Sequence, residues 1–155
     1  MSDKRIPWDQ YFMAIVDVVA TRATCDRGKS GAVIVKDKQI VSTGYVGSPS
    51  GMVHCDEVGH LFYRMTIDKE TKEHCGRTIH AEMNAIAQAA KNGISTNGAI
   101  MYCSMTPCWD CGKLIVQSGI IRAVCKNDYH ASQRTKDLFW NTGIVLVIMD
   151  ESLTY

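Results

Sequence analysis

Two short motifs, H-A-E beginning at His80 and P-C-W-D-C ending at Cys111, have the residue types that metal-assisted hydrolysis needs. His80, Cys108 and Cys111 are three ligands of the kind that hold a catalytic zinc, which leaves the fourth coordination position for water. Zinc lowers the pKa of such a water toward about 7, so hydroxide forms at neutral pH. Glu82 is well placed to move protons to and from that water.

Each motif alone has a plainer interpretation. A C-x-x-C pair can be a redox pair or half of a structural zinc site, and H-x-E occurs often by chance. A closed site of four ligands has no use for Glu82, however. Cys108 and Cys111 lie three residues apart at a predicted helix start, so both thiols face one side, and helix N-termini favour thiolates. Together the motifs favour a catalytic zinc.

The elements that must position these motifs alternate between helices and strands. Hydrophobic periodicity predicts helices over 8–22, 80–92, 108–118 and 131–141, and strands over 31–35, 40–45, 99–103, 121–125 and 144–148. The first two strands form a hairpin, and the later alternation implies parallel crossovers. We therefore predict one α/β domain over residues 1–155, with three α/β/α layers and a mixed five-stranded sheet.

The segment 47–79 does not fit this plan, because it carries no strong periodicity and is predicted to be a long connection. It is rich in His and Cys, which indicates that interactions of these side chains hold the segment in place. These residues are His54, Cys55, His60, His74 and Cys75. By contrast, Cys103 and Cys125 fall inside predicted strands, where we expect core packing.

Composition indicates the cellular compartment of the chain and the classes of partner it can have. Seven Cys is an odd number that includes a C-x-x-C, which favours a reducing compartment over a disulfide framework. No apolar run approaches the roughly 20 residues that span a bilayer, and residues 1–6 lack the apolar segment of a signal peptide. A net charge of +1 argues against a large nucleic-acid footprint. We expect a cytoplasmic protein without a membrane partner.

The sequence resembles the deoxycytidylate (dCMP) deaminase family within the cytidine deaminase superfamily. H-x-E followed by P-C-x-x-C is the signature of the zinc-dependent deaminases of cytosine and adenine. The G-Y-x-G-S-P loop at 44–49 and the Tyr-His pair at 129–130 indicate dCMP more specifically than free cytidine or tRNA. The resemblance covers nearly the whole chain, and its motifs lie at 31–35, 43–49, 54–57, 77–86, 105–108 and 129–130.

This resemblance implies a sheet of the cytidine deaminase type and hydrolysis of dCMP to dUMP, which feeds thymidylate synthesis. It implies that His80, Cys108 and Cys111 hold zinc and that Glu82 is the proton shuttle. It also commonly implies a homo-oligomer (a hexamer), activation by dCTP and inhibition by dTTP.

Four further residues match substrate-binding positions of the family. The backbone around Ala81 and Thr106 would contact the pyrimidine edge, and Tyr129 and His130 would lie near the sugar and phosphate. The alternative for Tyr129 is ordinary packing.

The chain also departs from the family pattern. Val46 stands where the family loop more often has Asn, whose amide contacts the sugar hydroxyl. Because Val cannot form that hydrogen bond, the contact comes from elsewhere or the substrate differs. Gly28 and Ser30 stand where we expect a basic residue and a Val. These departures bear on substrate identity more than on reaction type.

A second candidate metal site consists of Cys25, Cys55, His60 and Cys75. Some family members bind a second, structural zinc in this region, and three Cys with one His suit a closed tetrahedral site. His54 or His74 are substitute ligands. The alternative is that these cysteines are small buried apolar residues.

The Gly- and Ser-rich loop after the predicted hairpin is a candidate effector site. Backbone N–H groups near Gly47, Ser48 and Gly51 would cradle phosphates, and by resemblance this loop neighbours the effector site at a subunit contact. We expect dCMP dependence that is sigmoidal, and hyperbolic with dCTP and Mg²⁺. The alternative is a flexible connector.

Two rival functions stay open. One is a deaminase of another cytosine nucleotide or of a tRNA base; basic and acidic residues are too balanced over 126–140 to favour tRNA. The other is a catalytically silent zinc-binding module, which an intact Glu82 disfavours.

Overall fold

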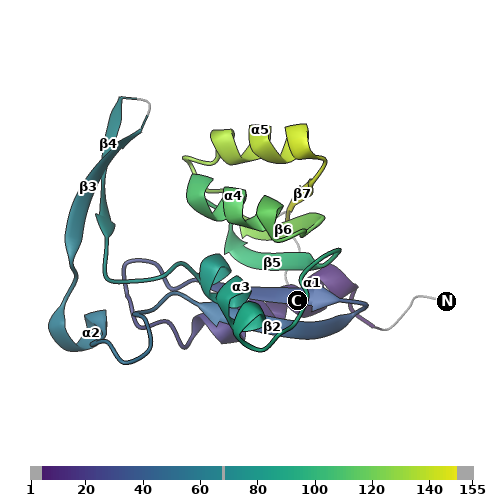
Figure 1. Cartoon of the computed structure of the whole chain (residues 1–155), viewed down its shortest axis with the longest axis horizontal. Coiled ribbons are helices and arrows are strands. Elements are labelled where there is room, and N and C mark those ends of the chain that lie inside the picture. The colour runs from purple at the N-terminus through teal and green to yellow at the C-terminus, as the bar shows by residue number, and fades with distance from the viewer. Residues whose placement is uncertain (1–4, 68, 150–155) are drawn as a thin grey trace.

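A mixed five-stranded sheet forms the centre of the chain (Figure 1), in the computed structural model that describes residues 5–67 and 69–149. The strands are β1 (Gly31–Lys36), β2 (Gln39–Tyr45), β5 (Ile100–Met105), β6 (Arg122–Asn127) and β7 (Val145–Ile148), in the spatial order β2-β1-β5-β6-β7. β1 is antiparallel to both β2 and β5, whereas β5, β6 and β7 are parallel. The predicted mixed sheet is confirmed.

Helices cover both faces of this sheet. Core residues of α1 (Trp8–Ala20) pack on one face, and those of α3 (Ala81–Lys91), α4 (Trp109–Gln117) and α5 (Gln133–Thr142) pack on the other. Ala32 and Ile34 face the second group while Val33 and Val35 face α1, so β1 is apolar throughout. The predicted three-layer α/β/α fold is confirmed. Among the described helices, none is long and apolar enough to cross a membrane.

The close approach of α3 to β2 places the start of that helix. A Cβ on Gly44 would lie 2.4 Å from the carbonyl oxygen of Ala81 and 2.3 Å from the backbone nitrogen of Ala85. A side chain at this position would therefore displace the first turn of α3. That turn follows His80 and carries Glu82, so Gly44 helps to fix both motif residues.

The segment 47–79 is more regular than the predicted long connection. It contains the short helix α2 (Cys55–Val58) and a separate hairpin of β3 (Phe62–Ile67) and β4 (Glu70–Cys75). Figure 1 shows this hairpin standing apart from the central sheet. Phe62 and Tyr63, on opposite faces of β3, are 51% and 44% exposed. Because neither hairpin face is buried, the sequence lacks the alternation that marks a half-buried strand.

None of the seven cysteines, all of which are described, forms a disulfide. Cys103 on β5 and Cys125 on β6 are fully buried with their Sγ atoms 3.5 Å apart. Their predicted role in core packing is confirmed.

Candidate active site

His80, Cys108 and Cys111 converge where α3 and α4 begin. His80 is the N-cap of α3, Cys108 is the N-cap of α4, and Cys111 lies in its first turn. The His80 Nδ1 atom is 3.5 Å from Cys108 Sγ and 3.4 Å from Cys111 Sγ. Bond lengths of about 2.3 Å to sulfur and 2.0 Å to nitrogen separate two such ligands of one tetrahedral zinc by about 3.5 Å. The three donor atoms therefore fit zinc.

The protonation of this triad also suits a cation. A hydrogen bond between Cys108 and Cys111, and a second one between Cys108 and His80, lower the pKa of the Cys108 thiol to about 4. The pKa of His80 is raised to about 9, mainly by the hydrogen bond to Cys108. The pKa of Cys111 is raised because this thiol shares its proton with Cys108 and is buried. Such a donor set exchanges its protons for a metal dication.

Glu82 lies beside the triad without belonging to it. Its side chain is buried, and its Oε2 atom accepts a hydrogen bond from Cys111 Sγ at 3.8 Å. Burial raises the pKa of this carboxyl group. A carboxyl group with a raised pKa next to a metal-binding triad is suited to exchanging protons with a reactant.

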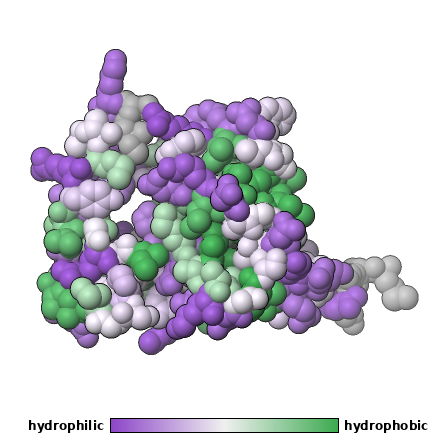
Figure 2. All heavy atoms as spheres, in the orientation of Figure 1, coloured by the Kyte–Doolittle hydropathy of each residue, from purple (hydrophilic) through white to green (hydrophobic). Residues whose placement is uncertain are grey.

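A cavity of about 800 Å³ opens onto the triad and Glu82. It lies between the body of the chain and the β3–β4 hairpin, where Figure 2 shows the surface hollowed. All four residues expected to contact substrate line it; these are Ala81, Thr106, Tyr129 and His130. Gly28 and Ser30 line it as well. Val46 adds a buried apolar side chain that packs against Cys25 and Cys55.

Other cavity residues escaped the sequence analysis. The hairpin contributes Tyr63 and Lys72, together with His74, which was expected only as a substitute metal ligand. The position of the hairpin over the cavity follows from a fold that periodicity did not show. Trp109 and Arg134 line the cavity from α4 and α5. Trp109 lies between the two Cys of the C-x-x-C motif, and this position is the sequence signal that could have identified it as a site residue.

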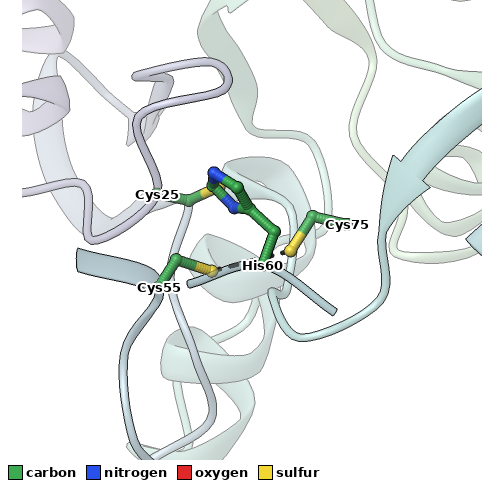
Figure 3. Close-up of side chains that lie close together, drawn as sticks. All are labelled: Cys25, Cys55, His60 and Cys75. Carbon is green, nitrogen blue, oxygen red and sulfur yellow. Dashed lines mark hydrogen bonds between the residues drawn. The ribbon is translucent and has the colours of Figure 1, made fainter. Parts of the chain in front are cut away.

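The second candidate metal set also comes together, at the base of the hairpin (Figure 3). Its four donor atoms, from Cys25, Cys55, His60 and Cys75, all lie within 4.8 Å of one another. Cys25 Sγ is 3.6 Å from His60 Nδ1, and the Sγ atoms of Cys55 and Cys75 are 3.5 Å apart. His60 Nε2 lies 3.0 Å from an Asp26 carboxylate oxygen, the outer contact that orients many metal-binding His side chains. The set fits a closed tetrahedral zinc site.

The two substitute ligands lie outside this cluster. His54 Nδ1 is hydrogen-bonded to Thr24 Oγ1 at 3.1 Å. The His74 ring lies against the Tyr63 ring, with centroids 5.6 Å apart. Neither side chain is required to complete the second set.

The candidate effector loop lies outside the residues that line the cavity. The Gly47 N–H group donates to the Ile79 carbonyl oxygen (3.3 Å) and the Ser48 N–H group donates to Thr24 Oγ1 (3.4 Å). Two of the N–H groups expected to cradle phosphate are therefore engaged within the chain. Gly51 adopts a positive φ of 85° at the far end of the loop.

The chain is similar to known proteins over most of its length. A family model described as the cytidine and deoxycytidylate deaminase zinc-binding region matches residues 6–127. ComE operon protein 2 of Bacillus subtilis is 43% identical over 152 residues, which are 97% of this chain and 76% of that protein. The deoxycytidylate deaminase of Schizosaccharomyces pombe is 32% identical over 148 residues, 92% of this chain but 44% of that enzyme. A crystal structure of the dCMP deaminase from cyanophage S-TIM5 with dCMP and dUMP aligns with a TM-score of 0.74 and 28% identity, covering 90% of this chain and 95% of that one.

Proposed function

Because the chain belongs to the cytidine and deoxycytidylate deaminase family, we propose that it hydrolyses dCMP to dUMP and ammonia with zinc as cofactor. The observation that carries this proposal is the convergence of three zinc-ligand side chains and a buried Glu82 at one cavity. The named S. pombe relative is a deoxycytidylate deaminase, and the cyanophage enzyme binds dCMP and dUMP.

The reaction assigns a task to each part of the site. Zinc on His80, Cys108 and Cys111 would supply Lewis-acid activation of a water molecule. Glu82 would accept one proton from the attacking water as the water oxygen bonds to C4 of the pyrimidine, and would pass that proton to ring N3. It would then take the remaining proton of the new C4 hydroxyl and pass it to the amino group, so the C4 carbonyl forms, the C4–N bond breaks and ammonia leaves.

The cavity walls support a nucleotide substrate. The backbone around Ala81 and Thr106 is assigned to the pyrimidine edge, next to Glu82. Tyr129 and His130, whose rings are 4.5 Å apart, are assigned to the sugar and phosphate.

The rival substrates are tested by an ammonia-release screen across dCMP, CMP, dCTP, deoxycytidine and RNA, with and without dCTP as effector. A tRNA-base deaminase needs exposed positive charge, whereas Lys126 and Lys136 are paired with Asp17 and Asp128 at 2.7 and 2.6 Å. We expect the highest activity with dCMP. Ammonia release from none of these compounds would favour a silent zinc-binding module.

Val46 provides a test of how the sugar is recognised. Val46→Asn is expected to raise turnover of dCMP severalfold. In the wild type another group supplies the hydrogen bond to the sugar hydroxyl poorly, and the Asn amide would supply it directly. The ratio of dCMP to CMP turnover, measured for both proteins, reports this contact. No change, or a loss, would indicate a pocket rebuilt around an apolar side chain.

We further propose that Cys25, Cys55, His60 and Cys75 hold a structural zinc. Cys25 belongs to the segment that follows α1, whereas His60 and Cys75 flank the two ends of the β3–β4 hairpin. A metal there would fasten the hairpin to the body of the chain, which it also meets through the Arg27–Glu73 ion pair (3.3 Å). The hairpin would then be held as a wall of the cavity.

We also propose regulation through the 47–51 loop. The Gly47 carbonyl oxygen accepts a hydrogen bond from the Ile79 N–H group at 2.8 Å, and Ile79 directly precedes the zinc ligand His80. A nucleotide that moves Gly47 would therefore act on the first turn of α3. Coupling of several sites requires several subunits, so this proposal includes a homo-oligomer, a hexamer by resemblance.

Steady-state kinetics test the regulation. We expect sigmoidal dependence on dCMP that becomes hyperbolic with dCTP and Mg²⁺, and inhibition by dTTP. Hyperbolic kinetics that neither triphosphate changes at millimolar concentration would leave a constitutive deaminase.

A cytoplasmic location completes the proposal. It is supported by seven thiols without a disulfide, as a reducing compartment maintains them. The net charge of +1 gives no support for a nucleic-acid partner.

A further inference from the structure

One carboxylate outside the cavity, that of Asp128, joins its own loop to two other segments, the connection before α4 and the helix α5. Asp128 Oδ1 accepts hydrogen bonds from the Thr106 hydroxyl at 2.9 Å and from the Ser132 hydroxyl at 2.8 Å. Asp128 Oδ2 accepts one from Lys136 Nζ at 2.6 Å. Thr106 belongs to the connection between β5 and α4, Ser132 is the N-cap of α5, and Lys136 lies within α5.

The loop that these bonds close carries Tyr129 and His130. Within the described chain, the side chains of these two residues contact each other but form no hydrogen bond that would orient them. The backbone holds the loop, because the Ser132 N–H group donates to the Tyr129 carbonyl oxygen at 3.0 Å. The placement of both rings in the cavity therefore depends on the ends of the loop, where Asp128 and Ser132 are joined.

The connection that carries Thr106 links this loop to the end of the cavity assigned to the pyrimidine base. Thr106 is buried, and its N–H group donates to the Asn127 carbonyl oxygen at 2.9 Å. Its hydroxyl reaches Asp128, and two residues later comes the zinc ligand Cys108. One carboxylate thus ties the wall assigned to the pyrimidine to the loop assigned to the sugar and phosphate.

We propose that Asp128 is a positioning residue that sets the spacing between Thr106 and the Tyr129-His130 loop, and thereby substrate affinity. This inference rests on the proposed function. The competing interpretation is a surface ion pair that only stabilises α5, because the Asp128 side chain is 44% exposed. Lys136 lowers the pKa of Asp128, so the carboxylate is charged at neutral pH under either interpretation.

Kinetics of two Asp128 variants separate these interpretations. Asp128→Ala removes all three bonds and is expected to raise the KM for dCMP about tenfold, with kcat within about threefold. Asp128→Asn keeps an oxygen for both hydroxyls and is expected to raise KM about threefold or less. The matched control is Asp17→Asn, which removes a similar Asp–Lys pair (2.7 and 2.9 Å to Lys126) away from the cavity and should leave KM unchanged.

Hydrogen exchange of the substrate-free protein gives a readout that does not depend on the substrate. Amides of residues 129–132 are expected to exchange faster in Asp128→Ala than in the wild type or Asp17→Asn. Unchanged exchange, or an unchanged KM beside a lowered melting temperature, would overturn the positioning role. If the wild type fails to deaminate dCMP, the proposed function fails, and the exchange result still decides whether Asp128 orders the loop.

Discussion

Replacing Glu82 by Gln is expected to lower dCMP turnover about a thousandfold or more while zinc content and melting temperature stay unchanged. Gln has nearly the same size, but it cannot take up and return a proton, a task worth about 10²- to 10⁴-fold in rate. The hydrogen bond that joins Glu82 to the triad is a long one, 3.8 Å from Cys111 Sγ, so the ligand set is expected to survive the change. Turnover, zinc analysis and thermal melting of the same preparation measure the three quantities.

The control for this experiment removes a ligand instead of the shuttle. Cys108→Ser or Cys111→Ser should abolish both zinc binding at this site and activity, because either change leaves two strong ligands. If zinc disappears together with Glu82, the assignment of Glu82 as a proton shuttle outside the ligand set is wrong.

Metal analysis of the zinc-loaded protein is expected to find close to two zinc ions per chain. Cys55→Ser should reduce this to one and lower the melting temperature by several degrees, because loss of a structural metal releases the base of the hairpin. The catalytic zinc, bound by His80, Cys108 and Cys111, should stay in place.

Cys103→Ser is the matched control, since it also replaces a buried thiol but one that lies outside both metal sets. It should lower stability while keeping two zinc ions. A stoichiometry of one in wild-type protein purified with ample zinc would contradict the second site.

The central sheet and the triad were predictable because their signals are local. The inner strands β1, β5 and β6 are largely buried on both faces and read as short apolar runs, and the ligands follow fixed spacings at helix starts. Cys108 and Cys111 needed only the geometry of one helix to be placed together. His80 needed the additional expectation that two helix starts meet.

The hairpin and Asp128 were not predictable from periodicity or motifs. Both faces of β3 are exposed, so no alternation marks it as a strand. Asp128 acquires its role from Thr106 and Lys136, which lie 22 residues before and 8 residues after it in the chain. Such a convergence of separate segments is a property of the folded chain.

The most direct test of the central claim is product analysis with dCMP and the zinc-loaded chain. We expect dUMP and ammonia to form in equal amounts, with activity lost on chelation, restored by zinc and absent from Glu82→Gln. An intact, zinc-loaded protein that forms neither dUMP nor ammonia from dCMP, with or without dCTP and Mg²⁺, would contradict the account.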